Sequence, residues 1–110
     1  MSNTFEKARI FSYNESITYA EKAVVSKQII KKDSGNISLF AFDKDEGLSE
    51  HTTPFDAIVF IVDGNAEITI DGVSQKLKTG ESIIMPANVP HALRAVEQFK
   101  MVLTMLKDNS

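Results

Sequence analysis

The sequence contains two histidines, and each belongs to a short segment rich in turn-forming residues. His51 stands four residues after Gly47 and precedes a long apolar run, and His91 directly follows Pro90. Imidazole titrates close to neutral pH and is the most common metal ligand among the side chains. Two imidazoles that meet in the folded chain would therefore suit a metal ion, a proton relay or a clamp for a polar ligand.

The alternation of side chains along a strand predicts which way these histidines point. If one strand runs unbroken from His51 into the apolar run, His51 and Thr53 lie on the same face as Val59, and that face belongs to the core. By the same parity, His91 shares a face with Leu93. We therefore expect both imidazoles to face the interior of the fold near its mouth and to approach each other.

Short β-branched and apolar segments, separated by turn signals, run along most of the chain. This pattern is typical of an all-β sandwich or barrel, and no segment shows a convincing helical period. The sequence also predicts a hairpin turn at Asp63–Gly64 and a polar loop over residues 43–49. The predicted strands cover residues 16–19, 23–31, 37–42, 55–62, 66–72, 73–78, 82–85, 91–96 and 99–106.

The composition places the protein among small globular domains. Its 110 residues are 43% hydrophobic and 25% charged, which suits a single domain with a real core. A net charge of -3 argues against a nucleic-acid partner, and the lack of cysteine excludes disulfides, thiolate metal sites and cysteine nucleophiles. No apolar run suffices for a membrane span, and the first residues lack a signal-peptide core. We therefore expect a cytoplasmic protein without a membrane partner.

Two predicted strands are apolar on both faces, which predicts a second covering layer. In the segments 37–42 and 58–62, apolar residues occupy neighbouring positions instead of alternating with polar ones. A small barrel has one interior and buries one face of each strand, so the other face needs a partner. We expect a homodimer, with residues 23–110 as the barrel and residues 1–22 as an N-terminal arm. The alternative is that the arm folds back over this face within its own chain.

Two motifs in this sequence resemble the two signature motifs of the cupin superfamily. The first reads Gly47-x3-His51-x-Thr53-x3-Ala57-x6-Gly64, and the second reads Gly80-x5-Pro86-x3-Pro90-His91. Asn88 stands where the second cupin motif has a glycine, and asparagine tolerates the left-handed backbone of a tight turn. The resemblance covers roughly residues 37–106. It implies a double-stranded β-helix with jelly-roll topology, as in small cupin-2 type conserved barrel proteins, and it also implies dimerisation.

The resemblance implies a metal site from which two ligands are missing. His51 takes the place of the first cupin metal ligand and His91 that of the last, whereas Thr53 replaces the second histidine and Ala57 replaces the glutamate. Catalytic metal sites normally keep three protein ligands, and a threonine hydroxyl adds little. A further ligand would have to come from another strand, and Gln75 is a candidate. We therefore expect no metal, or a weakly bound divalent ion.

Three classes of function fit these residues, and the sequence alone does not say whether the protein is an enzyme. The first is a small-molecule binding protein that uses His51, His91 and Thr53. The second is a metal-dependent enzyme, such as a dioxygenase or isomerase, in which His51, His91 and unidentified ligands hold the ion. The third is a dimeric module whose barrel is filled by apolar side chains, namely Val59, Ile61, Leu93 and Met101. In that third class, the histidines are structural groups bonded to nearby backbone.

Overall fold

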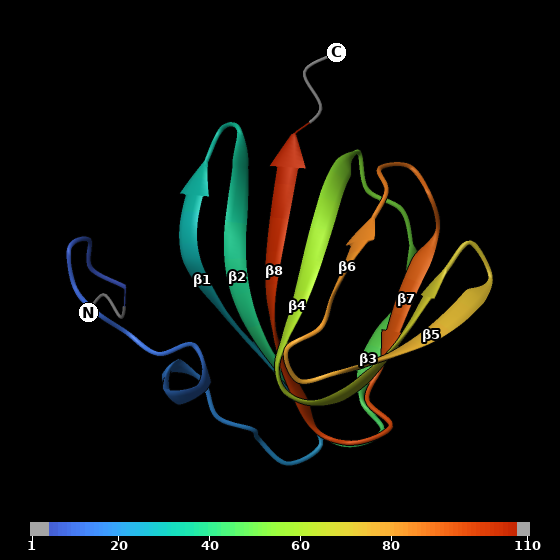
Figure 1. Ribbon diagram of the computed structural model, residues 1–110, viewed down its shortest axis with the longest axis horizontal. Helices are drawn as coiled ribbons and strands as arrows, with labels where there is room; N and C mark the ends of the chain where they lie inside the picture. The colour runs from blue at the N-terminus through green and yellow to red at the C-terminus, as the bar shows by residue number, and fades with distance from the viewer. Residues whose placement is uncertain (1–4, 108–110) are drawn as a thin grey trace.

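The structure is a computed structural model that describes residues 5–107. Within this range the chain is all-β, which confirms the predicted class, and its one helical turn is the 3-10 segment η1 (Asn14–Ser16) (Figure 1). No helix in the described part of the chain is long and apolar enough to cross a membrane. The eight strands are β1 (Val24–Lys32), β2 (Gly35–Phe42), β3 (Gly47–His51), β4 (Phe55–Ile70), β5 (Val73–Lys78), β6 (Ser82–Met85), β7 (His91–Arg94) and β8 (Phe99–Lys107).

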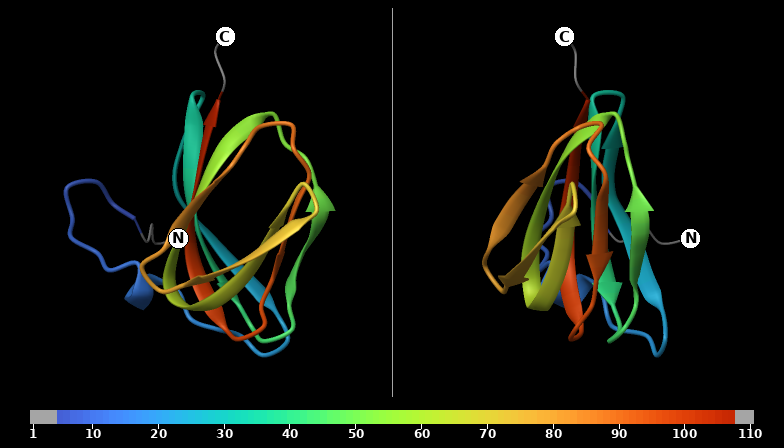
Figure 2. Two further views of the ribbon diagram at one scale, coloured as in Figure 1. Left: turned by 45° about the vertical axis from the view of Figure 1, so that its right-hand side comes forward. Right: turned by 90° about the vertical axis from the view of Figure 1, so that its right-hand side faces the viewer.

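The strands form two facing antiparallel walls that share β4. One wall has the order β1-β2-β8-β4-β6, and the other has the order β5-β4-β7-β3. The first half of β4 pairs with β8 and β6, and its second half pairs with β5 and β7. Figure 2 shows the two walls curling around a common interior. This arrangement is the double-stranded β-helix that the cupin-like motifs imply.

The predicted hairpin at Asp63–Gly64 is wrong, because β4 continues through it. Gly64 has a φ of +86° and still pairs with Phe99, and a bulge precedes it between Ile61 and Asp63. A β-carbon at Gly64 would overlap the carbonyl oxygen of Gln98. Glycine therefore allows the backbones to approach closely while β4 bends from one wall into the other.

Two further predictions about secondary structure are wrong. Residues 16–19 form no strand, because η1 occupies their start and Ile17 is held by packing against a sheet rather than by pairing. The predicted polar loop at 43–49 ends early, because β3 begins at Gly47. Its Leu48 pairs with Leu93 of β7 and packs against the core. A polar edge strand of this kind does not show the apolar alternation on which strand prediction depends.

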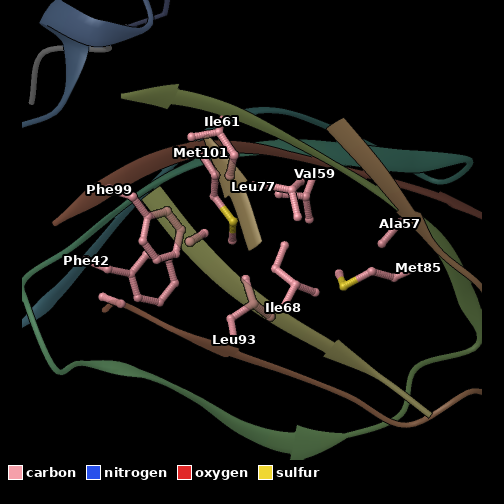
Figure 3. Packing of buried hydrophobic residues seen from close by; sticks show 12 residues of the cluster. Phe42, Ala57, Val59, Ile61, Ile68, Leu77, Met85, Leu93, Phe99 and Met101 are labelled. Atoms are coloured by element: carbon pink, nitrogen blue, oxygen red, sulfur yellow. The ribbon is translucent and has the colours of Figure 1, made fainter. Parts of the chain in front are cut away.

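The barrel interior is a filled apolar core (Figure 3). At the end near the β4 bend, the rings of Phe42 and Phe99 stack with centroids 4.4 Å apart. Ala57 and Met85 pair across β4 and β6 and lie at the opposite end of the cluster that Figure 3 shows. The residues predicted to fill the barrel, Val59, Ile61, Leu93 and Met101, are all buried members of this core.

The N-terminal arm lies on the outer face of the β1-β2-β8-β4-β6 wall. Ile17 is 1% exposed and packs in a second apolar cluster with Leu39 and Val102. The Lys100 ammonium donates hydrogen bonds to the backbone oxygen (2.7 Å) and the side-chain oxygen (2.9 Å) of Asn14. These contacts fasten residues 14–19 to the barrel of the same chain; residues 1–4 of the expected arm lie outside the described range.

The end of the arm is also tied to the β4 bend. The Tyr19 hydroxyl donates a 2.6 Å hydrogen bond to a carboxylate oxygen of Asp63. Burial of the phenol, then this bond and the negative charge of Asp63, raise the pKa of Tyr19. Tyr19 therefore stays a neutral donor, and the bend and the arm support each other.

Gly64→Ala should destabilise the protein strongly. We expect the free energy of unfolding to fall by at least about 2 kcal/mol, because the substitution combines backbone strain with a collision at Gln98. Gly72→Ala is the matched control: Gly72 has a φ of +80° but no atom within 4 Å of the added methyl group. It should cost only the left-handed strain, about 1 kcal/mol. Urea denaturation measures both, and equal losses would contradict this account of the bend.

Candidate functional site

The two imidazoles meet on neighbouring strands. His51 ends β3, His91 begins β7, and the two residues are register partners, so their side chains lie on the same side of the sheet. Their Nε2 atoms are 3.2 Å apart, and the ring centroids are 4.4 Å apart at an interplanar angle of 70°. The convergence predicted from strand parity is therefore confirmed.

The two rings differ in their environment. His91 is 4% exposed, whereas His51 is exposed at the rim. Burial lowers the pKa of His91, and a positive charge on His51 would lower it further; the carbonyl of Val89 acts weakly in the other direction. His91 is therefore a buried ring that favours the neutral form near neutral pH.

Backbone carbonyls constrain the tautomers of both rings. The Nδ1 atom of His51 is 2.7 Å from the oxygen of Ser49, and that of His91 is 3.3 Å from the oxygen of Val89. A carbonyl oxygen only accepts, so the short contact assigns the proton of neutral His51 to Nδ1 and leaves its Nε2 as a lone pair. The longer contact holds His91 less firmly, so this ring can donate either to Val89 or to His51.

The point between the two Nε2 atoms therefore favours a proton or a hydrogen-bond donor. When both rings donate to their backbone carbonyls, two lone pairs converge across 3.2 Å. A shared proton, a cation, or an N–H or O–H group of a ligand would remove the repulsion between these two lone pairs. The contacts with the backbone agree with the alternative that the histidines bond to nearby backbone. The sequence did not single out the carbonyls of Ser49 and Val89, whose only signal is that each precedes its histidine by two positions.

Thr53 does not lie on a strand with His51. β3 ends at His51 and β4 begins at Phe55, so the premise of one continuous strand is wrong. The Thr53 hydroxyl accepts a 3.0 Å hydrogen bond from the backbone N–H of Phe55, which ties it to its own turn. The Thr53 carbonyl accepts a 2.7 Å bond from Asn88, whose φ of 64° confirms the left-handed turn expected there. Thr53 thus joins the two histidine segments, and a ligand-binding role for it stays a prediction.

The surface next to the imidazoles is apolar. Ile70 is the register partner of His91, and Ala57 is the register partner of Met85 on the facing wall. Ala57 precedes Gly64 by seven residues and Ile70 follows it by six, so the bend brings both to the same end of the barrel. Figure 3 shows the sulfur of Met85 directed into the interior beside Ala57. A polar group held by the imidazoles would therefore sit beside the apolar side chain of Ile70.

Gln75 does not supply a further polar group to this site. It is exposed on β5 and is the register partner of Ile68, which places it two strands away from β7. Within residues 5–107, no group of three or more histidine, cysteine, aspartate or glutamate side chains is placed to hold a metal ion.

The sequence model of the Cupin domain family matches residues 38–107. The chain belongs to the cupin family. This match includes both histidines, and it agrees with the resemblance carried by the two motifs. A comparison with curated proteins gives no match.

Solved structures share most or all of the fold of this cupin. A conserved protein of unknown function from Streptococcus pyogenes is 35% identical with a TM-score of 0.91, over 100% of this chain and 98% of that one. A cupin superfamily protein from Desulfitobacterium hafniense is 29% identical with a TM-score of 0.89, over 96% and 97% of the two chains. A cupin 2 conserved barrel domain protein from Leptotrichia buccalis is 39% identical with a TM-score of 0.86, over 88% of this chain and 47% of its own.

The donor groups of this cupin do not fit the metal that many cupins bind. Two Nε2 atoms 3.2 Å apart match the spacing of two ligands on one ion, since zinc–nitrogen bonds measure about 2.0–2.1 Å. Beyond them, Ala57 offers a methyl group where the family has a carboxylate, and the Thr53 hydroxyl is engaged by Phe55. Two imidazoles alone would hold a divalent ion weakly.

The titration of His91 tests the electrostatics of the pair. In an NMR titration, His91 should titrate below about 6.5, the value of an unperturbed histidine. His51→Gln should raise that midpoint by removing the charge of the neighbour, and Glu50→Gln is the control that keeps both rings. A midpoint at or above 6.5, or one that ignores His51→Gln, would contradict the coupling.

The lowered pKa of His91 also makes the free energy of unfolding depend on pH. Because folding lowers the pKa of His91, the unfolded chain binds more protons between the folded and unfolded pKa values. This contribution to stability is complete above the unfolded value of about 6.5 and is lost as the pH falls from there through the folded pKa.

Proposed function

We propose that this cupin binds a small molecule at the mouth of its barrel, with one polar group held between His51 and His91. The observation that carries the proposal is the convergence of two Nε2 atoms, 3.2 Å apart, at the rim of an otherwise apolar interior. Binding sites of this kind combine an apolar surface with a few convergent polar groups.

The tautomers favour a ligand that donates a hydrogen bond. His51 presents an Nε2 lone pair because its Nδ1 proton is engaged by Ser49, and neutral His91 presents another when it donates to Val89. A hydroxyl or amine group is the chemistry that satisfies such acceptors. A carboxylic acid would bind here only in its protonated form, or as a carboxylate with one of the imidazoles protonated.

The filled core limits the size and position of the ligand. Val59, Ile61 and Met101 are fully buried and occupy the interior toward the bend. The ligand therefore stays at the mouth, beside Ile70 and the exposed ring of His51, rather than entering the barrel deeply. A compact molecule with a small apolar body and one donor group fits these conditions.

A screen of small alcohols and amines against matched carboxylic acids tests this proposal. We expect alcohols or amines to shift the NMR signals of His51 and His91, and His51→Leu to weaken that binding about three- to tenfold, the worth of one hydrogen bond. Glu50→Gln, at the exposed neighbouring position, is the control that should leave binding unchanged. Hits that bind elsewhere, or that bind His51→Leu as well as the original protein, would overturn the proposal.

A second candidate is a structural module whose barrel performs no binding. It is supported by the predicted plug of Val59, Ile61, Leu93 and Met101, all of which are buried. In that case the histidines simply satisfy each other and their backbone carbonyls. The screen separates the two candidates, because a filled module gives no ligand-dependent shift at either imidazole.

The metal-dependent enzyme remains an alternative that metal binding tests directly. We expect the purified protein to hold well under one equivalent of zinc, iron, manganese, nickel or copper. Restoring both family ligands with Thr53→His and Ala57→Glu should give tighter zinc binding by calorimetry. It should also give a melting temperature that zinc raises, because the ion then neutralises a carboxylate buried beside Met85.

The matched control carries Thr53→His and Ala57→Gln, which has the same size without the charge. Stoichiometric metal in the original protein that survives a weak chelator would contradict the two-ligand account. A restored variant with no gain over the control would show that residues 53 and 57 do not approach the imidazoles.

A further inference from the structure

Two aliphatic side chains continue the row of side chains that begins with the two imidazoles. Ile70 is the register partner of His91 on one side and of Val73 on the other, and His91 is the register partner of His51. Residues that lie directly opposite each other in an antiparallel sheet carry their side chains on the same face. The four side chains therefore form one row across β3, β7, β4 and β5, in the order His51, His91, Ile70 and Val73.

This row faces the interior of the barrel at its mouth. Leu77 follows Val73 by four positions on β5, so the two side chains share a face of the strand, and Leu77 is buried in the core. Ile68 precedes Ile70 by two positions and is buried in the same core. Val73 is thus on the inner side of its strand, yet it is 60% exposed. The row ends in an aliphatic side chain that the described part of the chain leaves mostly uncovered.

The turn between β4 and β5 fixes Val73 relative to the imidazoles. Asp71 and Gly72 have positive φ values of 50° and 80°, as in the two-residue turns that match the twist of paired strands. The Asp71 N–H also donates a 2.8 Å hydrogen bond to the carbonyl oxygen of Pro90, the residue before His91. The turn is therefore tied to the corner that carries the buried imidazole, and the row is one ordered surface.

We propose that this row holds the apolar body of the ligand and that Val73 sets the length of that body. The proposal rests on the function proposed above, in which His51 and His91 hold a hydroxyl or amine group. Beyond His91 the row offers only the aliphatic side chains of Ile70 and Val73. The part of the ligand that lies on them carries no polar group. The ligand class is a primary alcohol or amine whose alkyl chain lies along the row.

The spacing of the strands sets the length of the alkyl chain. β7 and β5 pair with β4 on its two sides, so two strand intervals separate His91 from Val73. Each interval measures about 4.8 Å, and the path from His91 to Val73 is about 10 Å long. An extended chain of roughly six carbons, with its hydroxyl and its terminal methyl group, covers this distance. Longer chains would pass beyond Val73 into water.

A series of straight-chain alcohols from ethanol to octanol tests this proposal, with binding followed through the NMR signals of the His51 and His91 imidazoles. Affinity should rise about two- to fourfold for each methylene up to roughly six carbons, because a methylene on an open row is buried on one side, and should then stay level. Val73→Ser should weaken hexanol binding about three- to tenfold and leave ethanol binding unchanged, because only hexanol reaches residue 73.

Ile84→Ser is the matched control. Ile84 is as exposed as Val73, at 61%, but it is the register partner of Ile58, whose chain neighbours Ala57 and Val59 face the core. Ile84 therefore lies on the outer face, and its substitution should leave the binding of every alcohol unchanged. His51→Leu should weaken the whole series by the same factor, because the hydroxyl end is common to all members. Circular dichroism confirms that each variant remains folded.

The series separates a failure of this proposal from a failure of the histidine site. Alcohols that shift the imidazole signals without a dependence on chain length would overturn the proposal and leave the histidine site intact. The same holds for a chain-length dependence that is equal in Val73→Ser. A rise in affinity that continues to octanol would overturn the length set by Val73. If no alcohol shifts either imidazole, the histidine site fails and the row fails with it.

Discussion

The architecture depends on one strand, β4, that belongs to both walls of the barrel. Its bend requires Gly64, because the backbone approaches Gln98 too closely for any side chain. The bend positions the rest of the molecule: it brings Ala57 and Ile70 to the same end of the barrel and presents Asp63 to Tyr19 of the arm. A local backbone conformation thereby determines the mouth, the core and the attachment of the arm.

The mouth of the barrel has the cupin fold, but two of its side chains differ from the metal ligands of the cupin motif. The cupin positions that would complete a metal site hold a methyl group at Ala57 and an engaged hydroxyl at Thr53, yet the two imidazoles keep a separation of 3.2 Å. The carbonyl of Ser49 holds the proton of neutral His51 on Nδ1, so its Nε2 accepts, and His91 offers a second acceptor when it donates to Val89. This arrangement supports the proposal that the mouth binds a small molecule through one hydrogen-bond donor group.

Much of this site could be predicted from the sequence, because side chains along a β-strand alternate between its two faces. The alternation of side chains correctly predicted that His51 and His91 lie on the same side of the sheet. The predicted continuation of this strand through Thr53 is wrong, because β3 ends at His51 and β4 begins at Phe55. The bend was mistaken for a hairpin, since Asp63–Gly64 has the same local signature in a tight turn and in a bulge. The sequence did not predict β3 because its pairing with β7 depends on residues forty or more positions away.

The central claim is that neutral His51 directs an Nε2 lone pair at His91, and a long-range 1H–15N NMR spectrum of the histidine side chains tests it most directly. At a pH where both rings are neutral, His51 should show its proton on Nδ1 and an unprotonated Nε2. His91 should report a hydrogen-bonded ring, either through Nδ1 to Val89 or through Nε2 to His51. His51 in the Nε2–H form, or two rings with the averaged signals of free histidine, would contradict the account.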